Sequence, residues 1–210
     1  MTSYQIEIKQ CPNCGCEFQA WAVASCNTID AKFYTDGFVD GPMYDEGGNL
    51  LTCPECKRYF WSEDVPTKKS MRDSEFFRDP ELGSLPCAGE VRGHHYEDIL
   101  SQALWKTEAQ EKYIRIRAWW SFNRVYRDYA TEEFNMSHEG EANLMRLLQL
   151  LDPNDPDESI MKAEVLRQLG QFDECLKQLD QPVDDNSYLK AIDTIKKLAN
   201  CKKRYVGSIE

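Results

Sequence analysis

Hydrophobic residues follow one pattern in the first third of the chain and another in the remainder. Short runs of alternating or aromatic residues occupy positions 17–25, 31–40 and 49–61 of the first third. Alternation is typical of a half-buried strand, and Asp36-Gly37 between two such runs is a hairpin signal. These runs predict a small antiparallel β unit within residues 1–66.

From residue 93 onward, hydrophobic residues recur every three or four positions, which is the pattern of amphipathic helices. Residues 96–130 contain neither Gly nor Pro and predict one long helix or two. Their apolar stripe is predicted to consist of Ala109, Tyr113, Ile116 and Trp120. Further helices are expected over residues 141–151, 158–169, 172–180 and 186–204.

Turn and cap residues divide these helices. We expect Asp157 to cap the helix over residues 158–169, Gly170 to end it, and the next helix to stop near Pro182. The fold class predicted from both patterns is α+β. The predicted parts are a β domain (residues 1–66), a polar connector (residues 67–92) and an α-helical domain (residues 93–210).

Composition limits the classes of partner. Hydrophobic residues make up 41% of the chain and charged residues 29%, as in globular proteins, and the formal net charge is −11. Such a charge argues against broad binding to nucleic acid or to an anionic membrane. No secretion signal or membrane-spanning apolar run is visible, so we expect a cytoplasmic protein without membrane association.

Cysteine spacing supplies the candidate chemistry. The chain has nine cysteines, and four of them form two CPxC knuckles, at Cys11 and Cys14 and at Cys53 and Cys56. Each knuckle offers two thiolates, and a closed structural zinc site needs four. We therefore predict one structural zinc ion. An iron–sulfur cluster or a single iron remains an alternative for four thiolates.

Paired CPxC knuckles that flank a three-stranded unit resemble a zinc ribbon, over roughly residues 8–64. The resemblance implies a rigid domain held by a closed metal site. Lys57 stands where the first knuckle has Gly15, which is a departure from the paired pattern. Cys16 could replace Cys14 as a ligand through a CxC pairing, or could be a bystander.

The helical part contains one stretch that resembles a tetratricopeptide repeat, over residues 157–182. The matching positions are Ala163, Leu169, Gly170, Phe172 and Cys175. A single repeat is weak evidence for a repeat array, and a plain helical bundle remains the alternative.

A possible binding surface combines polar residues of the predicted hairpin region with an Arg- and Trp-rich stretch. Arg and Trp are frequent in binding hot spots. The alternative is that these residues form core packing, turns and surface ion pairs. The candidates are Asn27, Lys32, Asp36, Arg115, Arg117, Trp119 and Arg124.

Three functions remain open. The order of these motifs resembles uncharacterised bacterial proteins with an N-terminal ribbon and a helical C-terminal half. The first hypothesis is a non-enzymatic adaptor that binds a protein partner of unknown identity. The second is a nucleic-acid- or transcription-associated ribbon, which the four basic and ten acidic residues of positions 1–66 disfavour. The third is an enzyme with a site near Cys26, His94 and His95; Cys87 has no predicted role.

Overall fold

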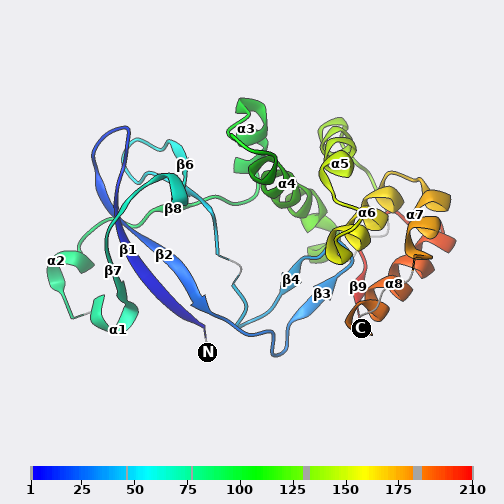
Figure 1. Ribbon diagram of the computed structural model, residues 1–210, viewed down its shortest axis with the longest axis horizontal. Coiled ribbons are helices and arrows are strands. Elements are labelled where there is room, and N and C mark those ends of the chain that lie inside the picture. Colours follow the sequence, from blue (N-terminus) through cyan, green and yellow to red (C-terminus); the bar gives the residue numbers. More distant parts are fainter. Residues whose placement is uncertain (1, 46, 77, 130–132, 182–185, 210) are drawn as a thin grey trace. The chain divides into compact units, whose positions relative to one another are not determined.

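The computed structural model describes residues 2–45, 47–76, 78–129, 133–181 and 186–209. These residues form two compact units (Figure 1). The first unit comprises the described residues of Met1–Ala31 and Gly41–Val91, and the second those of Lys32–Asp40 and Arg92–Glu210. The units differ from the predicted domains, because residues 32–40 belong to the second unit and residues 67–91 to the first.

The larger sheet of the first unit has the strand order β2-β1-β7, and both outer strands run antiparallel to β1. Its strands are β1 (Ser3–Gln10), β2 (Glu17–Ser25) and β7 (Thr67–Arg72). Ile6 and Ile8 share one face of β1 and pack with Met71 and Phe76 in a hydrophobic core. The strand predicted within residues 17–25 is confirmed, because β2 covers these residues. Two short helices follow β7, namely α1 (Asp73–Phe76) and α2 (Pro80–Gly83).

The stretch predicted to be a connector, residues 67–92, begins with the paired strand β7. Met71 is the buried position of this strand, and its other positions are exposed. A strand at the edge of a sheet can carry polar side chains on most positions, so its sequence lacks the alternation that identifies a strand. The connector prediction failed for this reason.

A second small sheet of the first unit has the order β6-β5-β8. Its strands are β5 (Leu50–Thr52), β6 (Tyr59–Trp61) and β8 (Gly89–Glu90), and the 3₁₀ turn η1 (Ser62–Asp64) follows β6. Phe18 and Ala20 of β2 form a core with Cys11 and Cys53, and the ring of Phe60 lies 5.5 Å from that of Phe18. The two sheets are therefore joined through a core that contains cysteines.

A buried lysine of β1 also connects this strand by hydrogen bonds to the residues that follow β6. Lys9 is 3% exposed, and its ammonium group donates to the carbonyl oxygens of Ser62 and Val65 and to the hydroxyl of Thr67, at 3.0–3.1 Å. Glu7 supplies the counter-charge at 3.0 Å. These partners replace the water that a buried ammonium group loses.

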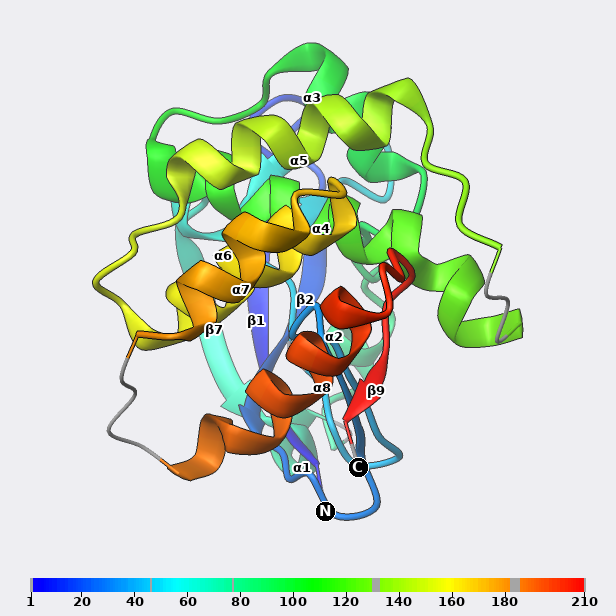
Figure 2. The same ribbon diagram turned by 90° about the vertical axis from the view of Figure 1, so that its right-hand side faces the viewer.

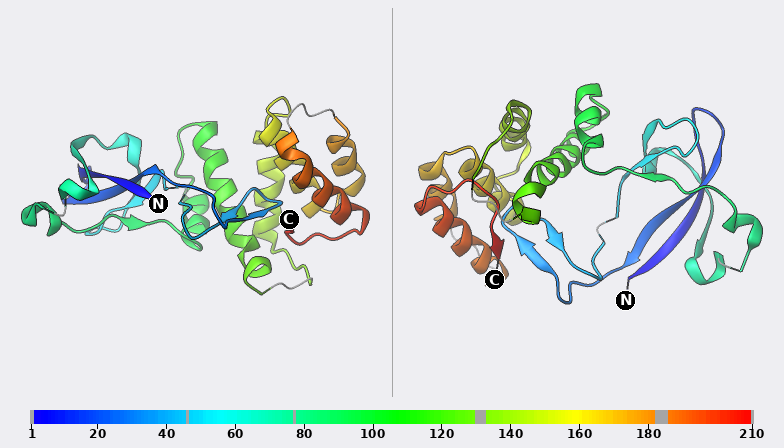
Figure 3. Two further views of the ribbon diagram at one scale, coloured as in Figure 1. Left: turned by 90° about the horizontal axis from the view of Figure 1, so that it is seen from below. Right: turned by 180° about the vertical axis from the view of Figure 1, so that it is seen from behind.

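The second unit begins with a hairpin from the N-terminal third of the chain. Strands β3 (Lys32–Tyr34) and β4 (Val39–Asp40) pair antiparallel, and Gly37 in the turn has a φ of +79°. The hairpin signal is therefore confirmed. β3 also pairs with β9 (Ser208–Ile209), which lies at the other end of the chain, as Figure 3 shows.

Helices form the remainder of the second unit: α3 (His95–Gln102), α4 (Glu108–Tyr129), α5 (His138–Leu150), α6 (Pro156–Gln168), α7 (Phe172–Leu179), the 3₁₀ turn η2 (Asn186–Tyr188) and α8 (Leu189–Asn200). The stretch without Gly or Pro thus contains two helices in its described residues, 96–129, and Ala103 ends α3 in a left-handed conformation with a φ of +50°. Asp155, rather than Asp157, caps α6 by accepting from the N–H of Glu158. Gly170 follows α6 with a φ of +82°, and Pro182 lies outside the described residues.

The buried side of α4 differs from the predicted stripe. Ala109 is exposed and Tyr113, Ile116 and Trp120 are half-buried. The buried hydrophobic residues of this helix are instead Ile114, Ala118, Trp119 and Tyr126. The helix contacts both α3 and α5, so its apolar residues are not confined to one side. The sequence therefore does not determine which set of residues spaced three or four apart forms the buried stripe.

Helices α6, α7 and α8 pack one against the next (Figure 2). Ala163 and Cys175 are both fully buried, in one cluster with Ile192 and Ile195 of α8. Small residues at these positions permit the close approach of α6 and α7 that the sequence suggested. The resemblance to a tetratricopeptide repeat stays a prediction.

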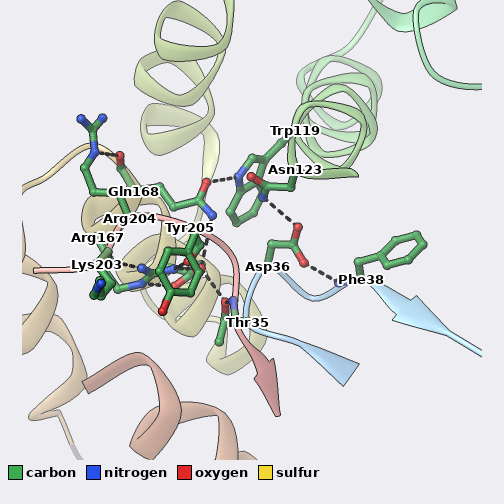
Figure 4. A network of polar contacts seen from close by, with 12 residues as sticks. Thr35, Asp36, Phe38, Trp119, Asn123, Arg167, Gln168, Lys203, Arg204 and Tyr205 are labelled. Atoms are coloured by element: carbon green, nitrogen blue, oxygen red, sulfur yellow. Dashed lines mark hydrogen bonds and ion pairs between the residues drawn. The ribbon is translucent and has the colours of Figure 1, made fainter. Parts of the chain in front are cut away.

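A buried ion pair connects the hairpin, α6 and the chain after α8. The Arg167 side chain donates to both carboxylate oxygens of Glu164 and to the carbonyl oxygens of Lys203 and Tyr205 (Figure 4). The Thr35 hydroxyl donates to Glu164 at 2.7 Å and accepts from the Gly207 N–H at 3.0 Å. Burial raises the pKa of Glu164 although Arg167 lies beside it. The pair therefore fixes the arrangement of these segments more than it adds stability.

Replacing one member of this pair should strongly destabilise the second unit. Glu164→Gln leaves the Arg167 charge buried without its counter-charge, so we expect the free energy of unfolding to fall by about 3 kcal/mol. Glu158→Gln is the matched control, because Glu158 pairs with Lys112 in a half-exposed position and should cost about 1 kcal/mol or less. Chemical denaturation followed by circular dichroism measures both; equal losses would contradict the assignment.

Candidate metal centre

Four cysteine sulfurs from two distant parts of the chain meet in the first unit. The Sγ atoms of Cys11, Cys14, Cys53 and Cys56 all lie within 4.8 Å of one another. Cys11 and Cys56 are 3.8 Å apart and Cys14 and Cys53 are 3.6 Å apart. Sulfurs bound about 2.3 Å from a tetrahedral zinc would lie about 3.8 Å from one another. The four residues therefore fit a tetrahedral thiolate metal site.

Each knuckle forms the turn between two antiparallel strands. In the first knuckle, which joins β1 to β2, the Cys11 N–H donates to Cys16 O and the Gly15 N–H donates to Cys11 O. In the second, which joins β5 to β6, the Cys53 N–H donates to Arg58 O and the Lys57 N–H donates to Cys53 O. The same backbone device thus presents two sulfurs in each hairpin.

The turns also direct N–H groups at the sulfurs. The Asn13 N–H lies 3.4 Å from the Cys11 sulfur, and the Cys56 N–H lies 3.5 Å from the Cys53 sulfur. Donors of this kind stabilise thiolates. The first cysteine of each knuckle is buried, whereas Cys14 is exposed and Cys56 is half-buried. One side of the site thus lies against the core and the other faces solvent.

The thiols differ in acidity before metal binds. The backbone N–H of Arg58 lowers the pKa of Cys56 to about 6, against desolvation. For Cys14 the backbone N–H of Cys16 also lowers the pKa, but desolvation and hydrogen bonds shared with the other three ligands outweigh it and raise the pKa to about 12. Metal binding must displace the remaining protons, so it is favoured by higher pH.

Lys57 adopts the conformation that Gly15 adopts in the first knuckle. Their φ angles are +59° and +76°, both in the left-handed region. The Lys57 ammonium group donates to the Pro54 carbonyl oxygen at 2.6 Å. The departure from the paired pattern therefore leaves the turn intact, at the cost of backbone strain at a residue with a Cβ atom.

Cys16 stays outside the cluster, whereas Cys14 belongs to it. The Cys16 sulfur donates to the Glu17 carbonyl oxygen at 3.4 Å. All nine cysteines are free thiols. Of those beyond the two knuckles, Cys26, Cys87 and Cys201 are exposed.

The predicted binding surface is not one surface, because two of its members are buried. Asp36 is fully buried and accepts from Asn123 at 2.8 Å (Figure 4). It also accepts from Arg127 at 2.6 Å. Trp119 is 1% exposed and donates to Gln168 at 2.8 Å. The Asp36 carboxylate and the Trp119 indole N–H, which the sequence predicted at the surface, thus have hydrogen-bond partners inside the second unit.

The remaining members have separate local partners. Arg115 pairs with Glu111 at 2.9 Å, and Arg124 pairs with Asp128 at 3.0 Å on the surface. Arg117 lies over the rings of Tyr113 and Trp120, 5.0 Å from each centroid. Lys32 is exposed on β3, and Asn27 lies in the first unit, where its side-chain oxygen accepts from the Ile29 N–H.

Arg146 is a partner that sequence reasoning missed. It donates two hydrogen bonds to Glu111, at 2.8 and 3.0 Å, and with Arg115 it lowers the pKa of that carboxyl to about 2. Glu111 and Arg146 lie 35 positions apart, on α4 and α5, so no local spacing indicates the pair.

The residues of the enzyme hypothesis belong to different units. Cys26 is exposed in the first unit, and His94 and His95 lie in the second. The His95 ring accepts from the Arg92 N–H through Nδ1 at 3.1 Å. The hypothesis stays a prediction.

Comparison of the chain with protein-family models, with curated proteins and with solved structures gives no match. In the described part of the chain, no helix combines the length and the apolar character that crossing a membrane requires.

Removing one ligand should release the metal and loosen the first unit. Cys53→Ser removes a fully buried thiolate, so we expect the metal content to fall from about one ion per chain to well below one. Loss of the ion removes its whole contribution to folding, so the first unit should lose several kcal/mol of stability, up to a binding free energy on the order of 10 kcal/mol. Elemental analysis and denaturation measure the two effects. Cys87→Ser, at an exposed cysteine outside the cluster, should change neither.

Relieving the left-handed strain at Lys57 should stabilise the metal-bound first unit. Lys57→Gly removes the Cβ atom, and we expect the free energy of unfolding to rise by about 1 kcal/mol. Lys57→Ala is the control, because it loses the same bond to Pro54 but keeps the strain. A glycine variant no more stable than the alanine variant would refute this explanation.

Proposed function

We propose that the protein is a zinc-binding adaptor, in which one structural zinc holds the first unit folded for binding a protein partner. The supporting observation is the cluster of four cysteine sulfurs within 4.8 Å of one another, two from each of two hairpin turns. Four thiolates fill the coordination sphere of zinc and leave no open position for substrate. A structural role of the ion follows from this donor set.

The choice of zinc rests on the paired knuckles and on the size of the unit. A tetrahedron of four thiolates also accepts a single iron, so metal analysis must distinguish the two. A β unit of this size buries little apolar surface for its length, and a structural zinc adds stability that its cores lack.

Exposed apolar side chains support an interaction role for the first unit. Trp21 is 38% exposed and Ile29 is 59% exposed. Aromatic residues are enriched in protein interfaces, whereas the excess of acidic residues disfavours nucleic acid as the partner. Nine free thiols suit a reducing compartment, so we place the protein in the cytoplasm, and the resemblance stated above suggests a bacterial one.

The test is a pull-down from the native host with the tagged full-length chain, compared with the Cys53→Ser and Cys87→Ser variants. We expect one zinc per chain and one specific protein partner with the native chain and with Cys87→Ser. Both should be lost with Cys53→Ser.

Two results would overturn the adaptor role. Salt-dependent retardation of RNA or DNA by the zinc-loaded chain would favour the nucleic-acid alternative. Turnover of a small molecule that is lost in Cys26→Ser would favour an enzyme.

A further inference from the structure

A small pocket in the second unit lies apart from the metal centre. It has a volume of about 140 Å³ and is lined mainly by apolar side chains of α4, α5 and the segment between them. Aromatic residues form much of its wall: Trp119, Phe122, Tyr126 and Phe134. The exposed residues Val125, Asn135 and Ser137 also line it, so the pocket opens to solvent on their side.

The volume limits the occupant to one ring. An engineered cavity of ~150 Å³ in another protein takes up benzene, whereas sites for drug-sized ligands begin at roughly 300 Å³. None of the described residues that line the pocket is charged. The occupant is therefore neutral and about the size of a six-membered ring.

A buried acceptor gives the pocket its polarity. Asn123 is 2% exposed and lines the pocket, and its Nδ2 donates to Asp36 at 2.8 Å. The carboxylate of Asp36 can only accept, which places the amide oxygen of Asn123 on the opposite side. Among the described residues, no group donates to that oxygen. This oxygen is not among the fully buried polar atoms without a partner, so it is open to the pocket, where a ligand with an O–H or N–H group would take the place of water as its donor.

A second amide that lines the pocket belongs to Gln168. The oxygen of Gln168, a fully buried residue, accepts from the Trp119 indole, so its NH₂ group is free to point elsewhere. The partner of this NH₂ group is Glu164, at the long distance of 3.4 Å. Figure 4 shows the Trp119 indole between the amides of Gln168 and Asn123. The Gln168 amide is therefore engaged by the Trp119 indole and by Glu164, and the Asn123 oxygen is the acceptor that the pocket offers next to its aromatic wall.

We propose that this pocket binds a small neutral molecule with a single aromatic ring and a hydroxyl or N–H donor, of the phenol type. The ring packs among the aromatic side chains, and its donor bonds to the Asn123 amide oxygen. The site is independent of the proposed zinc-dependent function, since all of its lining residues belong to the second unit.

Phenol is the probe, with benzene and cyclohexanol as comparisons, titrated into the metal-loaded full-length chain. Calorimetry and the NMR signals of the Trp119 indole N–H and the Asn123 NH₂ group report binding at this site. We expect saturable binding of phenol that is about tenfold tighter than that of benzene, because only phenol supplies the missing donor. Cyclohexanol should bind more weakly than phenol, because it lacks the aromatic faces.

Two substitutions with tryptophan make a matched pair of variants. Val125→Trp places a bulky side chain at the mouth and should weaken phenol binding at least tenfold. Met145→Trp is the control, at a residue of α5 that is 51% exposed and does not line the pocket, and should leave binding unchanged. Asn123→Leu should bring the affinities for phenol and benzene close to each other. If that variant fails to fold, the Val125→Trp comparison still decides whether the pocket is the site.

Several outcomes would overturn the proposal. Equal affinity for phenol and benzene in the native chain would show an apolar void without a polar function. No saturable binding of phenol, or binding that Val125→Trp leaves intact, would show that the pocket holds only water. Tighter binding of N-acetyltyrosinamide than of phenol would show that the occupant of the pocket is a tyrosine side chain of a protein partner and not a small molecule.

Discussion

The buried pair of Glu164 and Arg167 holds together parts of the second unit that are far apart in sequence. Its charges are shared with Thr35 near the start of the chain and with the backbone of residues 203–205 near its end. An arginine fork has donors enough to satisfy a carboxylate and two carbonyl oxygens together. Burial makes any other arrangement costly, because a displaced segment would leave one of the charges without a partner. The position of the hairpin beside α6 depends on this constraint.

The metal centre imposes a similar constraint on the first unit by different means. Two identical turns, each stabilised by its own backbone hydrogen bonds, bring together sulfurs that are about 40 positions apart. A metal bound there would close the intervening chain into a loop, and that restriction lowers the entropy of the unfolded state. The core of Phe18 and Phe60 covers the buried side of the same cluster. Local turn chemistry and long-range closure therefore support one geometry.

Local signals in the sequence predicted the features that depend on neighbouring residues. The two knuckles, the turn at Gly37 and the end of α6 at Gly170 all require particular residues within four positions, and each is present in the structure. The edge strands β7 and β9 could not be predicted in this way, because their partners lie elsewhere in the chain and their own residues are mostly polar. Asp36 read as a surface carboxylate for the same reason, since Asn123 and Arg127, which bury it, are about 90 positions away.

The pairing of β3 with β9 has a consequence for the order of events during synthesis. The first unit is complete once residue 91 has left the ribosome, but the hairpin at residues 32–40 lacks its third strand until Ser208 and Ile209 emerge. At about 5–20 residues per second, this interval is on the order of ten seconds. During that time the hairpin interrupts the sequence of the first unit, and β3 lacks its partner strand β9. The emergence of Ser208 and Ile209 thus decides when the three-stranded sheet of the second unit can form.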